Sequence, residues 1–409
     1  MAAEESDDQP LWLAPELFPP QPTRAPYGVI GEKGKLSEFS TLDELAEYVG
    51  TARNTVLAIW TPDSERTMPM DGEPGLLEAL RRRNNRIAEV DFSNAKRSGL
   101  IFGVVLLWAL LSAWANRGFI PFMENQQLGL AALLFFWLAG VPLYEALKLR
   151  RETARLSEES LRATEREARF DYWLSLQKMP VTMVLLGMLA AVAAGQAALG
   201  LGLNWIDSCL KAGLLKNDLT LPDGTIYTGG YNNGEYWRLW TGPLLHGNLL
   251  HLGMNAFALW YLGRRTECLA RWPHLVMAYL AALLIGGLAS IHLMPDKLSV
   301  GASGGIMGLL GFLLVFETLH ARLVPKRARI RLVSAAVVIF VIGAVAQSFI
   351  DNAAHAGGLV AGMAYAFVAF PKSSSAHRPT STGLDFALGA GTLVVLTASV
   401  LLALWKILA

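Results

Sequence analysis

The sequence predicts an all-α polytopic membrane protein that begins with a small soluble α/β segment. Three observations predict this class. Hydrophobic residues make up 53% of the 409 positions and charged residues only 17%, against about 25% charged in an ordinary soluble domain. The apolar residues gather in about nine runs of the roughly 17 to 25 residues that a helix needs to cross a bilayer. Finally, Lys and Arg occupy every second loop between these runs.

Each apolar run is expected to form one membrane-spanning helix. Basic residues precede the first run and follow the second, fourth, sixth and eighth, whereas the loops between are nearly free of Lys and Arg. Because basic loops remain in the cytoplasm, the N-terminus is predicted to be cytoplasmic and the C-terminus to lie outside. The expected spans are 99–116, 127–147, 181–203, 239–262, 273–293, 300–319, 330–349, 352–370 and 383–406.

The residues ahead of the first span are expected to form a soluble module. The acidic N-terminus has no apolar core, so it resembles neither a secretory signal nor a transit peptide. The first thirty or so residues, rich in Pro and Gly, are expected to be loosely ordered. After them, Thr41 and Glu44 form a capping-box pattern that opens a helix towards Tyr48. Residues 55–60 are expected to form a strand and residues 76–86 another helix.

These patterns divide the chain into five expected segments. Acidic and basic residues alternate through the linker between the second and third spans at spacings that favour pairs one helical turn apart. We interpret this linker as a solvated connector, with a regulatory or partner-binding helix as the alternative. The segments are a cytoplasmic α/β segment (1–95), a transmembrane hairpin (96–148), the charged linker helix (149–177), a six-helix core (178–372), and a cytoplasmic loop with an additional C-terminal helix (373–409).

Two polar residues inside the spans have the chemistry of a nucleophile and its base. Ser303 stands at the head of the sixth span, in Gly301-Ala302-Ser303-Gly304-Gly305, and His355 lies near the start of the eighth. A serine hydroxyl is a poor nucleophile at neutral pH, so Ser303 needs a base, and His355 can accept its proton and return it to a leaving amine. The glycines around Ser303 allow another backbone to approach it.

Three more polar residues, His246, His251 and Asn255, fall in the expected fourth span. On a helix, His251 and Asn255 differ by about 40° and share a face, while His246 points towards another side. Taken alone, they could simply hydrogen-bond neighbouring helices. The predicted topology nevertheless places His251, Asn255, Ser303 and His355 at a similar depth below the outer face. We therefore expect a single site, in which His251, Asn255 and the Ser303 backbone N–H donate hydrogen bonds to an oxyanion.

The combination of these motifs resembles the rhomboid family of intramembrane serine proteases over roughly residues 178 to 372. The combination is highly specific, although Gly-x-Ser-x-Gly alone is not. The matching features are Gly301-Ala302-Ser303-Gly304, His355 followed by Gly358 and Gly362, His246-x4-His251-x3-Asn255, Trp237-Arg238 before the fourth span, and Glu267 after it.

The resemblance implies a six-helix rhomboid-like core, to which two N-terminal spans and one C-terminal span are additions. It implies a Ser303–His355 dyad with His251 and Asn255 at the oxyanion, and it implies hydrolysis of a peptide bond in transmembrane protein substrates. No cofactor and no metal are implied, and the net charge of +1 gives no indication of a nucleic-acid partner. The expected location is a bacterial inner (plasma) membrane, and the oligomeric state is left open. His246, Gly301, Gly304 and Met307 are expected to support the site.

Two positions need separate interpretation. Family members often carry an aromatic residue one turn after the serine, packed on the histidine ring, and this sequence has Met307 there. A thioether can also pack on an imidazole, so we expect the geometry to be kept. Asp351 lies one turn before His355 and suggests a triad, but we interpret it as the N-cap of the eighth helix.

Other protease classes fit the sequence less well. A soluble hydrolase elbow needs a strand before the serine, and His-Glu-x-x-His, the signature of a zinc protease, is missing from the sequence. An aspartyl protease needs two acids at one depth, whereas Glu317 and Asp351 are expected at different depths. A transporter is disfavoured because the halves show no evident repeat. An active protease and a catalytically silent rhomboid-like binder of membrane helices remain, and retention of Ser303 and His355 favours the first.

Overall fold

The computed structural model describes residues 10–13, 17–31, 34–52, 56–117, 135, 139–154, 158–200, 203–220, 224–345 and 350–409. Within them the protein is mostly helical, with small sheets. The chain divides into two compact units, one formed by 1–175, 324–331 and 337–350 and the other by 176–323, 332–336 and 351–409. Helix α12 (Lys326–Val345) contributes residues to both.

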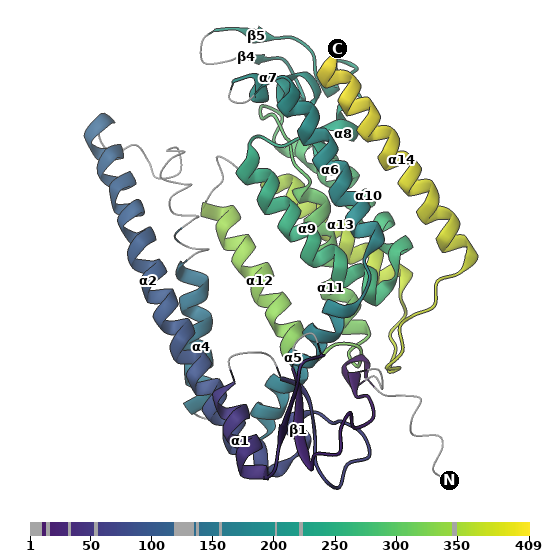
Figure 1. Cartoon of the computed structure of the whole chain (residues 1–409). Coiled ribbons are helices and arrows are strands. Elements are labelled where there is room, and N and C mark those ends of the chain that lie inside the picture. Colours follow the sequence, from purple (N-terminus) through teal and green to yellow (C-terminus); the bar gives the residue numbers. More distant parts are fainter. Residues whose placement is uncertain are drawn as a thin grey trace. The chain divides into compact units, whose positions relative to one another are not determined.

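The first unit contains the expected soluble module. Its sheet has β1 (Tyr27–Gly31) between β2 (Leu36–Phe39) and β3 (Val56–Trp60), both antiparallel to it, and α1 (Leu42–Thr51) packs against it (Figure 1). The capped helix and the third strand confirm the expectation, because Thr41 Oγ1 accepts the Glu44 amide.

Strand β1 corrects the expectation that the first thirty or so residues are loosely ordered. Val29 in this strand is fully buried and packs in a cluster with Leu45 and Val49 of α1. The strand has two glycines among its five residues, so its local preference for a strand is weak. It is ordered by two neighbouring strands, which a local pattern does not reveal.

Helix α2 (Leu77–Arg117) corrects a second expectation. The helix predicted over 76–86 and the span predicted over 99–116 are one continuous helix of 41 residues. No proline interrupts the polar stretch between them, so nothing ends the helix there. Two helices follow in this unit, α4 (Val141–Ala154), which packs against α2, and α5 (Glu158–Leu176). Most of the expected second span, and residues 155–157 of the linker, lie outside the described residues.

Buried ion pairs join α5 to the soluble module. Arg83 of α2 donates to Glu165, and Arg169 donates to Asp71, with all four side chains largely buried. A charge buried without a partner is costly, so each pair favours one placement of α5 on the module. The charged linker is therefore partly a packing surface rather than a solvated connector along its whole length.

The second unit is a helical bundle around α10 (Trp272–Leu293) and α11 (Ser303–Leu319). Helix α13 (Asn352–Ala369) packs against both, as does α9 (Leu249–Ala270), while α14 (Gly383–Leu408) packs against α10 and α6 (Pro180–Ala198) (Figure 1). The remaining elements are short: α7 (Leu203–Ala212), β4 (Leu219–Thr220), β5 (Ile226–Tyr227) and α8 (Arg238–Thr241).

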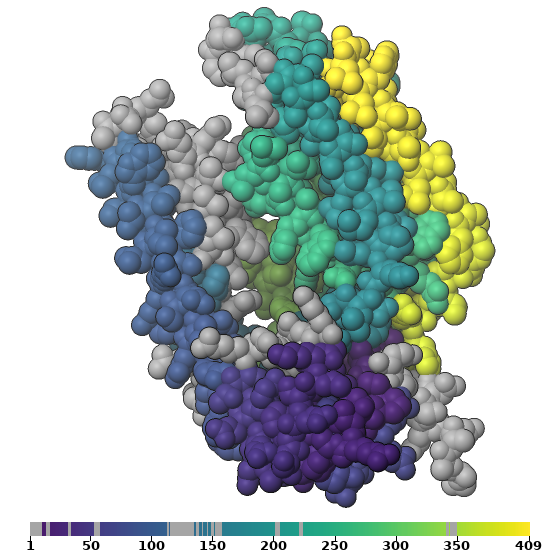
Figure 2. Space-filling model, viewed as in Figure 1, coloured from purple at the N-terminus to yellow at the C-terminus, as the bar shows by residue number. Residues whose placement is uncertain are grey.

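Four candidate membrane spans occur among the described residues. They are Pro74–Ser112, Pro180–Ala198, Trp272–Leu293 and Gly383–Leu408, and Ser303–Leu319 is a shorter apolar helix. Helices α9, α12 and α13 also lie on expected spans, and polar residues lower the mean hydropathy of α9 and α13. Helix α14, yellow in Figure 2, lies at the surface of the molecule. Its Leu388, Leu401 and Trp405 are exposed, as expected where one side of a helix faces lipid.

The start of the expected fourth span is wrong. Residues 238–244 form α8 and a short 3-10 helix, and α9 begins only at Leu249, where the Asn248 side chain accepts the His251 amide at 2.8 Å. Pro243 and Gly247 interrupt the apolar run, but they change its mean hydropathy too little to mark the break. His246 therefore precedes the helix, and the angle expected between it and His251 does not apply.

Buried charges at the opposite end of α9 are paired. Glu267 accepts the Val181 and Thr182 amides at 3.0 and 2.8 Å, and so caps the start of α6. Arg265 donates to both oxygens of Glu317 in α11, at 2.6 and 2.9 Å. Glu317, considered above as a catalytic acid, is thus held in an ion pair.

Helices α11 and α13 touch backbone to backbone. A Cβ at Gly358 would overlap the Gly304 carbonyl oxygen, and one at Gly362 would overlap the Gly308 carbonyl oxygen. Small residues allow helices to approach this closely, and the resulting packing is a main source of stability between helices in lipid. The crossing sets the relative depth of the first turns of both helices.

We expect Gly362→Ala to lower stability by about 1–3 kcal/mol, because the added methyl meets backbone that cannot move aside cheaply. The measurement is the thermal midpoint of the full chain in detergent. Gly391→Ala in α14 is the matched control, since nothing lies within 4 Å of a Cβ there. Equal midpoints for the two variants would contradict the close crossing.

Candidate active site

Ser303 is the first residue of α11, which begins after a turn through Gly301 and Ala302. Its backbone N–H is one of the four that a helix leaves without an internal partner, and the helix dipole favours negative charge at this end. The Ser303 amide can therefore donate to an anionic oxygen near its own side chain.

Gly301 lies directly beneath His251 and Asn255. Its φ of 116° is a conformation that favours glycine. A Cβ there would lie 2.8 Å from His251 Nε2 and 3.2 Å from Asn255 Nδ2. His251 and Asn255, one turn apart on α9, thus share a face as expected and point at the backbone two residues before Ser303.

Asn255 has an unused donor. Its side chain is largely buried, and Nδ2 has no hydrogen-bond partner among the described residues. A buried donor without a partner costs free energy, so its placement beside Gly301 requires an explanation. A ligand oxygen above the Gly301–Ser303 segment would satisfy it.

His246 is fully buried, although it precedes α9. Its backbone is held on both sides, because its amide donates to Gln196 Oε1 at 3.1 Å and its carbonyl accepts Trp205 Nε1 at 2.6 Å. The ring lies edge-on to that of His251, with centroids 5.1 Å apart. His246 therefore packs behind His251 and restrains its ring.

His355 lies in the first turn of α13, and its neighbours contact the residue after Ser303. A Cβ at Gly304 would lie 3.5 Å from the Ala354 carbonyl oxygen, and Gly358 also lies against Gly304. The starts of α9, α11 and α13 therefore lie close together, with His251 and Asn255 against Gly301 and the first turns of α13 against Gly304. A single site of Ser303, His355, His251 and Asn255 stays a prediction.

Asp351 caps α13, as expected. Its Oδ1 accepts the Ala354 amide at 2.9 Å, and its Oδ2 accepts hydrogen bonds from Ser290 and Ser299. Among the described residues, no hydrogen bond joins this carboxylate to the His355 ring. Met307 is buried in α11 one turn after Ser303, and its packing on the His355 ring stays a prediction.

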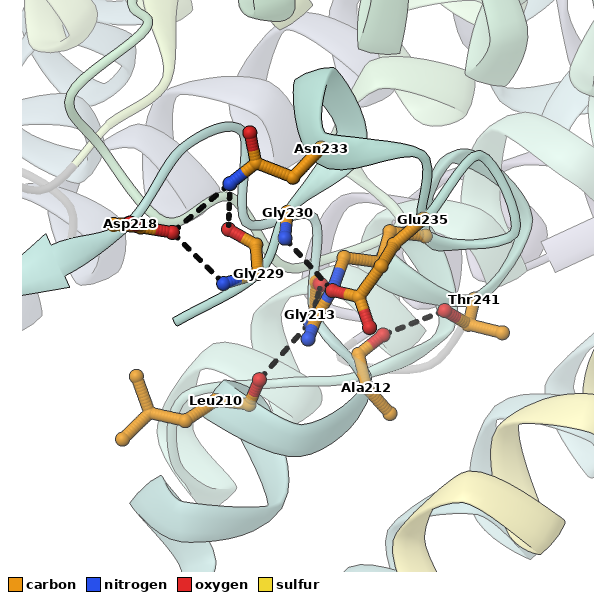
Figure 3. A network of polar contacts seen from close by, with 10 residues as sticks. Leu210, Ala212, Gly213, Asp218, Gly229, Gly230, Asn233, Glu235 and Thr241 are labelled. Carbon is orange, nitrogen blue, oxygen red and sulfur yellow. Dashed lines mark hydrogen bonds and ion pairs between the residues drawn. The ribbon is translucent and has the colours of Figure 1, made fainter. Parts of the chain in front are cut away.

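The loop between α7 and α8 is braced by Arg238, whose side chain is almost fully buried. Nη1 donates to the Leu210 and Gly213 carbonyls at 3.0 and 2.8 Å, and Nε donates to Glu235 at 2.6 Å. Figure 3 shows this region, including the bond from the Gly230 amide to Glu235 and the bond from Thr241 to the Ala212 carbonyl. The Gly242 carbonyl next to Thr241 accepts the Gly301 amide at 3.3 Å. The loop thus supports the turn before Ser303.

Sequence reasoning missed three residues that contact this region: Lys216, Ser290 and Ser299. Lys216 is fully buried and donates to Ser299 Oγ at 2.7 Å. One signal pointed to it, because it is a lysine in an outer loop that the topology expects to be nearly free of basic residues. No group of three or more His, Cys, Asp or Glu in the described residues is placed to hold a metal ion. Both cysteines, Cys209 and Cys268, are free and buried.

Residues 233–372 match the family model described as "Rhomboid domain". This range includes the starts of α9, α11 and α13 and all four residues expected to carry chemistry. The resemblance seen in the motifs is confirmed for this part of the chain, which contains a rhomboid domain.

Curated relatives match the same region. "Rhomboid protease GluP" from Bacillus subtilis (strain 168) is 36% identical over 166 residues, which are 39% of this chain and 32% of that protein. "Inactive rhomboid protein 1" from Rattus norvegicus is 31% identical over 139 residues, 34% of this chain and 16% of that protein. "RHOMBOID-like protein 6, mitochondrial" from Arabidopsis thaliana is 33% identical over 135 residues, 33% of this chain and 44% of that protein.

The chain therefore spans less than half the length of each of these relatives. They include a protein named as a protease and a protein named as inactive at similar identity. Family membership of this region is therefore compatible with both an active and an inactive protein.

We expect Arg238→Met to loosen the loop before α8, because the buried Leu210 carbonyl oxygen loses the Arg238 donor at a cost of about 1–3 kcal/mol and the Gly213 carbonyl keeps only the Leu215 amide. Limited proteolysis should cut residues 213–237 faster in the variant, and the thermal midpoint in detergent should fall. Lys372→Met, at an exposed position, is the control. Unchanged proteolysis of Arg238→Met would contradict the bracing role.

Proposed function

We propose that this chain is an intramembrane serine endopeptidase that cleaves peptide bonds in or near transmembrane segments of membrane proteins. One observation carries the proposal: His251 and Asn255 lie over Gly301 while Ala354 and Gly358, which flank His355, lie against Gly304. Three residues with complementary chemistry, His251, Asn255 and His355, are therefore placed around the short backbone segment that carries Ser303. Such convergence of polar groups in an apolar bundle favours a catalytic site over isolated hydrogen bonds between helices.

In the proposed reaction, Ser303 Oγ attacks the carbonyl carbon of the scissile bond while His355 takes the hydroxyl proton. His355 then donates this proton to the leaving amine, and an acyl ester remains on Ser303. Water, deprotonated by His355, hydrolyses the ester and restores the hydroxyl. The dyad needs no metal ion or cofactor for these steps.

The oxyanion formed in each half-reaction needs donors placed in advance. The candidates are the Ser303 amide at the start of α11, the unpartnered Asn255 Nδ2, and His251. Together they offer three donors from two helices around one point. Donors fixed before the reaction stabilise the transition state without reorganisation.

The substrate class follows from the environment of the site. The proposed topology has nine spans with a cytoplasmic N-terminus, and the integral membrane protein is placed in a bacterial inner membrane. Six spans between 178 and 372 form the core, the hairpin over 96–148 and the helix within 373–409 are additions, and 149–177 links the hairpin to the core. A site among the first turns of core helices reaches peptide bonds near the end of a substrate helix, where the backbone unwinds most easily.

A catalytically silent protein that binds membrane helices is the second candidate. A relative named "Inactive rhomboid protein 1" at 31% identity makes it relevant. Retention of Ser303 and His355, together with the donor set around Gly301, favours the protease.

We expect a fluorophosphonate probe to label the detergent-solubilised protein at Ser303, because the probe reacts with a serine activated by a base. Labelling should disappear in Ser303→Ala. Labelling that persists in this variant, or its absence in the wild type, would falsify the protease proposal.

We also expect cleavage of a transmembrane substrate with a helix-destabilising residue. His355→Ala should abolish cleavage, since the base is lost, and Asn255→Ala should lower kcat about 10²–10³-fold, as loss of one oxyanion donor does. His377→Ala, which removes an exposed histidine, should cleave at the wild-type rate. Equal kcat values for the Asn255 variant and the wild type would remove Asn255 from the oxyanion site.

A further inference from the structure

A buried polar cluster adjoins the candidate site and takes no part in the reaction proposed above. Its members are Lys216, Ser290 at the end of α10, Ser299 in the segment before Ser303, and Asp351. Ser290 Oγ and Ser299 Oγ lie 2.9 Å apart, and both contact Asp351 Oδ2. Lys216 Nζ donates to Ser299 Oγ and to the Lys297 carbonyl. We call this set the Asp351 network.

The network connects the segment that carries the nucleophile to the helix that carries the base. Ser299 is four residues before Ser303, and Asp351 is four residues before His355. The Asp351 carbonyl also accepts the His355 amide at 3.0 Å. A single carboxylate oxygen therefore holds the start of α13 at a defined distance from the chain entering α11.

A buried lysine, Lys216, distinguishes the Asp351 network from an ordinary helix cap. Lys216 is completely buried, with 0% of its surface accessible. Burying a lysine is expensive unless it is paired and hydrogen-bonded. The Leu214 amide and carbonyl pair with the carbonyl and amide of Ser299 at 2.9 and 3.1 Å, so the backbone also ties this loop to the segment before Ser303.

We infer that Asp351 is a positioning residue, and that with Ser290, Ser299 and Lys216 it sets the approach of His355 to Ser303. This inference rests on the proposed function. A cap alone requires only the bond to the Ala354 amide, which Asp351 Oδ1 supplies. The second oxygen is free to contact both serines, and this contact joins the helix start to the nucleophile segment.

The charges in the network are balanced near neutral pH. Burial opposes ionisation of Asp351, but hydrogen bonds from Ser290, Ser299 and the Ala354 amide and the charge of Lys216 hold its pKa below the usual value. Burial lowers the pKa of Lys216 to about 8, although Asp351 acts against this shift and Lys297 adds to it. Lys216 is positive below that pH and neutral above it, so the network loses its counter-charge as the pH rises past about 8.

The test compares two variants that each replace a carboxylate cap by its amide. Asp351→Asn alters the network, and Glu267→Gln alters the cap of α6 at the far end of α9. For each full-length variant in detergent we would measure the thermal midpoint, kcat and KM for a transmembrane substrate, and the rate of fluorophosphonate labelling of Ser303. Both should lower the midpoint, but only Asp351→Asn should lower kcat and the labelling rate, by at least about tenfold, with KM little changed.

Ser299→Ala tests the same inference if Asp351→Asn does not fold, because it leaves the bond between Asp351 and the Ala354 amide intact. It should lower the labelling rate in the same way. Wild-type labelling rates in Asp351→Asn or Ser299→Ala would overturn the inference, as would an equal loss in Glu267→Gln. If the wild type itself is not labelled, the proposed function fails instead.

The pH profile separates positioning from general stability. The wild-type labelling rate should decline above about pH 8 as Lys216 loses its proton. Lys216→Met should lack this decline and label slowly at every pH, because Asp351 has then lost its counter-charge. A decline near pH 8 that is unchanged in Lys216→Met would show that Lys216 has no part in positioning the site.

Discussion

The backbone contact between α11 and α13 is the constraint on which the rest of the second unit depends. Gly358 and Gly362 lie so close to Gly304 and Gly308 that a Cβ on either would overlap a backbone carbonyl oxygen of α11. In lipid, helices gain little from the hydrophobic effect when they associate, so close packing of this kind provides much of the driving force. The contact also fixes depth, because a shift of one turn would place side chains where only glycine fits. The first turns of both helices therefore stay level, and these turns carry Ser303 and His355.

Polar contacts at both ends of the bundle also restrict how its helices can be placed. Glu267 caps α6, Arg265 binds Glu317, and Arg238 holds the loop before α8. Each buried charge would be costly without its partner, so each pair permits few alternative placements. The bundle combines a close apolar crossing in its interior with specific polar contacts at the helix ends, which leaves the site little freedom to deform.

Much of the fold could be predicted from local sequence patterns. Apolar runs placed α6, α10, α11 and α14 within a few residues, since length and hydropathy are properties of the segment itself. The cap at Thr41 and the cap at Asp351 follow from short-range chemistry. The start of α9 could not be placed in this way, because Pro243 and Gly247 break the helix without lowering the apolar character enough to mark it. Strand β1 was missed because its order comes from β2 and β3, which lie on either side of it.

The candidate site, like the fold, could be predicted from the sequence only in part. The sequence by itself determined which residues have the chemistry of a nucleophile, a base and oxyanion donors, because this chemistry depends on residue type. It also predicted a similar depth for them from their positions along the expected helices. Only the tertiary structure decided that Gly301 lies under His251 and Asn255, that His246 packs behind His251, and that one oxygen of Asp351 joins Ser290 and Ser299 beside a buried Lys216. The physical reason is that these contacts join segments far apart in the chain. Their formation depends on how closely α11 and α13 approach, and local sequence patterns do not contain that distance.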